Sequence, residues 1–137
     1  MSYNNDIEKY FFANDSKPLP VFKWHHYFEI YEKHFSRFRG KKPNVLEIGV
    51  GDGGSLLMWK KYFGEGAKIF GLDSRAECKN FLDRSDFDNI DIQIGDQADE
   101  QFMNYYIHNS PQFDIVIDDG GHKMNQQISS FNYLLSL

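Results

Sequence analysis

Four stretches of the chain carry residues that could bind a nucleotide-like ligand. The first is a glycine-rich loop, Glu47-Ile-Gly-Val-Gly51, which continues through Gly53 to Ser55. The others carry acids and their neighbours: Asp73, then Asp96 with Gln97, then Asp118 with Asp119. Glycine lets the backbone turn sharply and approach a ligand closely, and a carboxylate can accept both hydroxyls of a ribose. One such acid alone is typical of a helix cap or a turn, but four in succession favour a common site.

The glycine spacing allows two kinds of ligand. Gly49, Gly51 and Gly54 match the G-x-G-x-x-G pattern of dinucleotide-binding domains. Glu47 lies two residues before the first glycine, where a dinucleotide gains nothing from an acid and a cationic ligand does. A ligand with a sulfonium, an amino group, a ribose and an adenine therefore fits the acidic positions better than a nicotinamide dinucleotide.

The regular elements around these residues alternate in type. The apolar spacing predicts strands at 44–48, 68–72, 90–94 and 113–117, and helices at 24–38, 55–63, 76–82, 99–108 and 125–135. Alternating strands and helices require crossover connections, so the strands run parallel with helices on both faces. The sequence predicts an α/β, Rossmann-like doubly wound sheet, whose ligands lie beyond the carboxyl ends of the strands.

Composition narrows the class of partner. The 137 residues carry a net charge of −5 without a basic run, which disfavours nucleic acid and anionic lipid. No apolar run is long enough to cross a membrane. The single cysteine, Cys78, cannot form an internal disulfide, which suits the cytoplasm, and we interpret it as a packing residue.

The motifs resemble those of a known family. Val45–Gly51, Gly71-Leu-Asp73, Gly95-Asp-Gln97 and Phe113–Asp119 resemble the successive motifs of class I S-adenosylmethionine-dependent methyltransferases. Two further segments, Gly53–Trp59 and Asp118-Asp-Gly-Gly-His122, resemble the macrocin O-methyltransferase group, whose relatives include cephalosporin hydroxylase-like proteins. The resemblance covers roughly residues 24–137.

The resemblance implies a role for each candidate residue. Glu47, Gly49 and Gly51 would line the methionine and ribose of S-adenosylmethionine. Gly53 and Ser55, at the start of the next helix, would also bind the cofactor. Asp73 would hold the ribose hydroxyls, Asp96 and Gln97 would lie near the adenine, and Asp118 would lie beneath the methionine. Asp119 would bind a magnesium ion, and His122 would be the catalytic base.

These assignments predict a metal-assisted O-methyltransferase acting on a sugar or a sugar-containing small molecule. A divalent cation lowers the pKa of a sugar hydroxyl, and a histidine can remove its proton as the methyl group transfers. Three alternatives stay open: a metal-dependent hydroxylase on the same fold, a non-catalytic binding or assembly module, and a nicotinamide-dependent oxidoreductase. Product mass would separate methylation from hydroxylation.

The domain organisation follows from the same resemblance. Residues 1–22 are predicted to be a loosely structured lead-in, and residues 23–137 to be the S-adenosylmethionine-binding domain. Class I methyltransferases continue through a fifth strand and a final hairpin. We therefore expect a truncation after the fourth strand and its helix. A homo-oligomer is left open.

Overall fold

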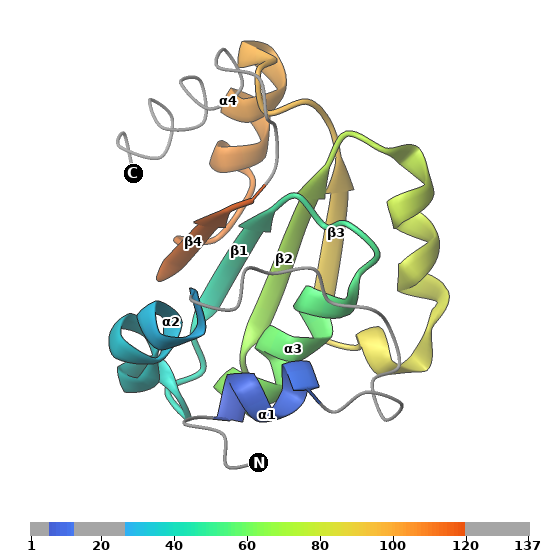
Figure 1. Ribbon diagram of the computed structural model, residues 1–137. Helices are drawn as coiled ribbons and strands as arrows, with labels where there is room; N and C mark the ends of the chain where they lie inside the picture. The colour runs from blue at the N-terminus through green and yellow to red at the C-terminus, as the bar shows by residue number, and fades with distance from the viewer. Residues whose placement is uncertain (1–5, 13–26, 120–137) are drawn as a thin grey trace.

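The computed structural model describes residues 6–12 and 27–119 and contains a four-stranded sheet (Figure 1). Its strands are β1 (Asn44–Ile48), β2 (Lys68–Asp73), β3 (Ile90–Ile94) and β4 (Ile115–Asp118). All neighbouring pairs are parallel, in the order β3-β2-β1-β4. The chain therefore leaves β1 in one direction and later returns to its other side. This reversal places a topological switch point between β1 and β4, where open α/β sheets bind ligands.

The described helices either precede β1 or occupy the connections between the strands. They are α1 (Asp6–Phe12), α2 (Tyr27–Phe35), α3 (Gly54–Phe63) and α4 (Glu100–His108), with shorter 3₁₀ segments η2 (Ser36–Phe38), η3 (Ala76–Asp83) and η4 (Ser85–Phe87). In Figure 1, α1 and α3 lie in front of the sheet. None of the helices in the described part of the chain has the length and apolarity to cross a membrane.

Two apolar cores cover the two faces of the sheet. Side chains alternate along a strand, so Val45 faces one core while Leu46 and Ile48 face the other. The larger core joins the strands to α1, α2, α3 and η3, and its biggest side chain is the fully buried Trp59. The smaller core joins them to α4 through Met103 and Tyr106. The prediction of a doubly wound sheet is confirmed.

The structure changes two of the predicted elements. The lead-in was expected to lack regular structure, but residues 6–12 form α1. Its Ile7 is buried in the larger core, and Asp6 accepts a hydrogen bond from Arg39 at 2.8 Å. These tertiary contacts hold a segment whose local pattern is weak. The helix predicted at 76–82 is a 3₁₀ helix over 76–83, and the one at 125–135 lies outside the described residues.

The start of α4 follows the sequence prediction. Asp99 is its N-cap, and the side chain accepts a hydrogen bond from the Phe102 backbone N–H at 3.2 Å. Such a bond satisfies one of the free N–H groups at a helix start. This short helix therefore begins at a defined residue just after the third candidate acid, Asp96.

Candidate functional site

The glycine loop begins between two of the predicted acids, Asp73 and Asp118. Ile48, the last residue of β1, lies opposite Leu72 on one side and Asp118 on the other. Asp73 follows Leu72, so the two carboxylates lie on either side of the strand that feeds the loop. The loop itself turns through Gly51, at φ +58°, and Gly53, at φ +85°. The parallel register thus brings acids 45 residues apart in sequence to one edge of the sheet.

The Asp73 carboxylate holds the loop through backbone hydrogen bonds. Its Oδ2 accepts the Val50 N–H at 2.9 Å and the Gly51 N–H at 3.4 Å. Among the described residues, no heavy atom lies within 4 Å of a Cβ built on Gly51, so none of them fills the space beside this turn. The structure thus places a carboxylate at the glycine turn, which is the place where a ribose binds in related α/β sheets.

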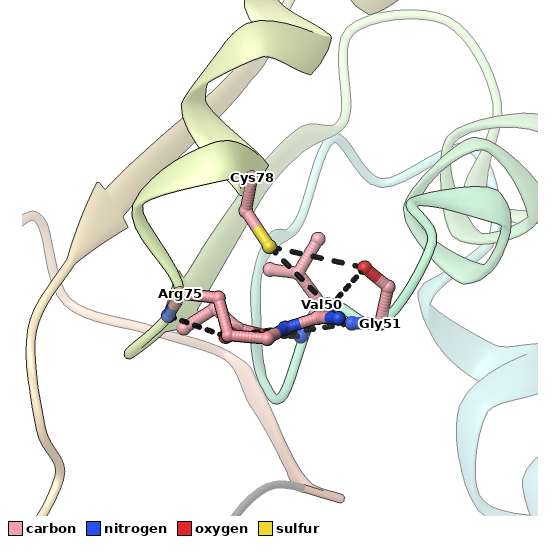
Figure 2. A network of polar contacts seen from close by, with 5 residues as sticks. Val50, Gly51, Arg75 and Cys78 are labelled. Carbon is pink, nitrogen blue, oxygen red and sulfur yellow. Dashed lines mark hydrogen bonds and ion pairs between the residues drawn. The ribbon is translucent and has the colours of Figure 1, made fainter.

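Arg75 and Cys78 complete a small polar network at this loop (Figure 2). Asp73 Oδ1 accepts the Arg75 backbone N–H at 2.9 Å and its Nε at 3.3 Å. The same guanidinium donates through Nη2 to the Gly51 carbonyl. The Cys78 thiol, on η3, lies 3.8 Å from that carbonyl oxygen and is buried. One arginine therefore ties the end of β2 to the glycine loop.

These contacts determine the charge state of Asp73. Burial by itself would raise the pKa of the Asp73 carboxyl, but hydrogen bonds from the Arg75 and Val50 backbone and the Arg75 side chain outweigh it. The net result is a pKa below the ordinary value. At neutral pH the side chain is therefore a pure acceptor, which is the state that binds ribose hydroxyls.

A pH dependence of stability follows from this shift. Because the folded pKa is lowered, the Asp73 contribution is present above the unfolded pKa and is lost as pH falls through the folded value. The stability advantage of the wild type over Asp73→Asn is expected to be constant between about pH 5 and 8 and to shrink below about pH 4. Urea unfolding across this range measures it. An advantage that grows towards low pH would contradict the assigned hydrogen bonds.

Glu47 is buried beneath the loop rather than displayed on its surface. It is fully buried, and its two carboxylate oxygens accept hydrogen bonds from the Ser55 hydroxyl and, at 2.9 Å, from the Trp59 indole N–H. Ser55 and Trp59 are four residues apart on α3, so both face the end of β1. The predicted cofactor roles of Glu47 and Ser55 stay predictions. In the structure the two residues join α3 to β1 directly below the loop.

The segment with Asp96 and Gln97, which follows β3, meets the segment with Asp118 and Asp119 at the end of β4. Gln97 is buried, and its amide nitrogen lies 3.5 Å from Asp118 Oδ2. Because β2 and β1 lie between β3 and β4 in the sheet, the segment after β3 must cross the strand ends to reach Asp118. Asp96 is exposed and caps its own turn by accepting the Ala98 N–H at 2.9 Å. The predicted place of Gln97 beside the adenine is untested, and its observed neighbour is the Asp118 side chain.

The predicted metal and base positions are only partly described. Asp119 is exposed, and its backbone N–H donates to the Ile48 carbonyl at 2.8 Å. Within residues 6–12 and 27–119, no group of three or more metal-ligating side chains gathers. Magnesium favours several oxygens in octahedral array, so the described residues do not by themselves fit that ion. His122 lies outside the described residues.

Gly71 is required by the packing beneath the loop. A Cβ on Gly71 would lie 2.8 Å from Val50 Cγ2 and 3.1 Å from Leu56 Cδ1. Gly71→Ala is therefore expected to lower the free energy of unfolding by about 1–3 kcal/mol, because the buried neighbours must move. Urea titration gives the value. Val50→Ala removes the closest methyl, so the double variant should lose less than the sum of the two single variants. Strict additivity would contradict the assigned clash.

Sequence analysis assigned no role to Trp59 or Arg75. The four-residue spacing of Ser55 and Trp59 on a predicted helix was the available signal for Trp59, since it puts both on one face. Arg75 follows Asp73 by two residues, but sequence alone does not show that its guanidinium turns back to the Gly51 carbonyl. That contact depends on the path of η3.

The sequence is similar to several curated sugar O-methyltransferases. One from Streptomyces olivaceus, 8-demethyl-8-(2-methoxy-alpha-L-rhamnosyl)-tetracenomycin-C 3'-O-methyltransferase, is 40% identical over 118 residues, covering 81% of this chain and 29% of that enzyme. Mycinamicin VI 2''-O-methyltransferase from Micromonospora griseorubida is 41% identical over 113 residues, covering 75% and 26%. Demethylmacrocin O-methyltransferase from Streptomyces fradiae is 37% identical over 122 residues, covering 82% and 29%. No protein-family model matches the chain.

The fold has a solved counterpart. The methyltransferase MycE of the mycinamycin biosynthetic pathway, in complex with Mg, SAH and mycinamycin VI, superposes with a TM-score of 0.75 at 34% identity, over 94% of this chain and 32% of MycE. A second MycE structure, with Mg and SAH, gives a TM-score of 0.74 at 36% identity, over 85% of this chain and 32% of MycE. This chain has the class I methyltransferase fold, and its sequence is similar to the macrocin O-methyltransferase group. The resemblance inferred from the motifs is confirmed, and the chain spans less than a third of the length of each of these relatives.

Proposed function

We propose that this chain binds S-adenosylmethionine at the glycine loop and forms the cofactor-binding part of a sugar O-methyltransferase. The observation that carries the proposal is the Asp73 carboxylate, held at the end of β2 against the backbone of Val50 and Gly51. Its lowered pKa keeps it an acceptor, and no other described residue fills the space beside Gly51 of the loop. MycE, the related solved methyltransferase, is described in complex with SAH.

Different residues of the chain would bind different parts of the cofactor. Asp73 would accept the ribose hydroxyls, and the loop at Gly49 and Gly51 would lie against the methionine and ribose. Glu47, with its Ser55 and Trp59 donors, would fix the start of α3 under the loop. Asp118 would lie beneath the methionine part, steadied by Gln97. The bound cofactor supplies an activated methyl group.

The acceptor and the catalytic step belong to the same proposal. The curated relatives are named for methylation of sugar hydroxyls on tetracenomycin, mycinamicin, macrocin and oleandolide compounds, which favours a sugar hydroxyl as the acceptor. His122 would be the base. Asp119 would contribute to a magnesium site only with further oxygen ligands, since the described residues form no metal-binding group.

The nature of the transferred group tests the proposal. The protein would be incubated with S-adenosylmethionine labelled in its methyl group and a panel of rhamnosylated or deoxysugar-bearing acceptors, and the products weighed by mass spectrometry. The expected product gains one labelled CH₂ unit. A product that gains an oxygen atom instead would identify the hydroxylase alternative and reject methyl transfer.

A further inference from the structure

The Asp73 carboxylate already has as many donors as it can accept. Oδ1 receives the Arg75 backbone N–H and its Nε, and Oδ2 receives the backbone N–H groups of Val50 and Gly51. A carboxylate offers about four acceptor sites. The two hydroxyls of a ribose can therefore bind Asp73 only if two of these donors move away.

The geometry indicates which donors give way. The bonds from the backbone N–H groups of Val50 and Arg75 are both 2.9 Å, whereas those from Arg75 Nε and the Gly51 N–H are 3.3 and 3.4 Å. One long bond is on each carboxylate oxygen, which matches the two positions that a ribose diol occupies. The Arg75 side chain is 46% exposed, so water can solvate its guanidinium once it leaves.

We propose that Arg75 closes the glycine loop onto Asp73 in the free protein and competes with the ribose hydroxyls of the cofactor. This inference rests on the proposed function, because it concerns the same site. In closing the loop, the guanidinium bridges Asp73 and the Gly51 carbonyl. Binding of a ribose exchanges the Arg75 Nε and Gly51 N–H bonds for two hydroxyl bonds. Arg75 is thus a positioning residue that lowers the affinity of the site for its own cofactor.

The exposure of Arg75 determines how much its guanidinium lowers the affinity for the cofactor. Exposed ion pairs contribute little, so removing this one should tighten cofactor binding by about two- to fivefold. The same competition favours ligands that carry both hydroxyls. A ligand that lacks one of them displaces the arginine without replacing both of the donors that leave.

The alkylation rate of the Cys78 thiol reports whether the glycine loop is closed. It is the only cysteine in the chain, its thiol is buried, and it lies 3.5 Å from Arg75 Nη2 and 3.8 Å from the Gly51 carbonyl oxygen. Burial raises the pKa of the Cys78 thiol, so labelling is best followed above pH 8. Loss of the guanidinium should free the loop and expose this thiol to a small reagent.

The test compares Arg75→Met with a matched control, Arg84→Met. Methionine keeps an unbranched apolar stem and removes the guanidinium. Arg84 forms the same kind of exposed pair, with Asp86 two residues away at 2.9 Å, but away from the loop. Calorimetry with S-adenosylhomocysteine and the rate of Cys78 alkylation by iodoacetamide are measured on wild type and both variants. Circular dichroism verifies that each variant is folded.

The proposal predicts tighter binding and faster alkylation for Arg75→Met alone. Arg75→Lys, which keeps one charge but cannot bridge both partners, should change both quantities in the same direction and by less. Weaker or unchanged affinity of Arg75→Met would overturn the competition, and an unchanged alkylation rate would overturn the closed loop. If none of the proteins bound S-adenosylhomocysteine, the proposed function would fail. Equal binding by all of them would reject only the role of Arg75.

Discussion

Replacing Trp59 with alanine is expected to lower the free energy of unfolding by about 3–5 kcal/mol, a large share of the stability of a small domain. Trp59 is fully buried in the larger core. Its indole makes edge-to-face contacts with Tyr31 and Phe35 of α2, at centroid distances of 5.0 and 5.8 Å, and its N–H donates to Glu47. Urea unfolding followed by circular dichroism measures the loss.

A phenylalanine at position 59 separates packing from the hydrogen bond. Trp59→Phe keeps most of the aromatic contacts but removes the donor to a buried Glu47 oxygen, so it should cost about 1–3 kcal/mol. Combining Trp59→Phe with Glu47→Gln, which removes the charge, should cost less than the sum of the two single changes. A Trp59→Phe variant as stable as the wild type would show that the indole donor does not support Glu47.

Replacing Asp73 with alanine is expected to weaken S-adenosylhomocysteine binding by at least about 100-fold. Each hydrogen bond to a charged group contributes roughly 1.5–3 kcal/mol, and the variant loses two such bonds to the ribose together with the anchor of the loop. The loop contribution is direct, since Asp73 Oδ2 accepts the Val50 N–H. Calorimetry of the two proteins gives the ratio of dissociation constants.

The matched control removes Asp88, an acid at the amino ends of the strands, opposite the end that carries the glycine loop. Asp88 precedes β3 and pairs with Lys60, far along the strands from the glycine loop. Asp88→Ala should therefore bind S-adenosylhomocysteine as the wild type does. Equal affinities for Asp73→Ala and Asp88→Ala would mean that Asp73 does not hold the ribose.

The sheet and the placement of the acids were predictable because they depend on local signals. The strand predictions at 44–48 and 90–94 have the bounds of β1 and β3, since short apolar runs bounded by glycine and polar residues are typical of parallel strands. Crossover helices then fix the strand direction, and parallel strands bring Asp73 and Asp118 to one edge. Periodicity does not contain the order of the strands in the sheet, which the structure supplies.

The remaining features depend on contacts between distant segments. Helix α1 was missed because Ile7 becomes a core residue only when α1 packs near α3. The cofactor role of Glu47 stays a prediction, and the sequence did not show that its carboxylate accepts hydrogen bonds from Ser55 and Trp59 below the loop. No sequence pattern predicts the contact of Arg75 with the glycine loop. The backbone turn after β2 brings its guanidinium to the Gly51 carbonyl.

Titration of the 137-residue chain with S-adenosylhomocysteine measures whether the glycine loop binds the cofactor. We expect saturable binding with one ligand per chain, lost in Asp73→Ala and retained in Asp88→Ala. The structural basis is the ionised Asp73 carboxylate beside a loop whose Gly51 turn is not covered by any other described residue. No binding by the unmodified chain, or binding that Asp73→Ala leaves unchanged, would contradict the assignment of this loop as the cofactor site.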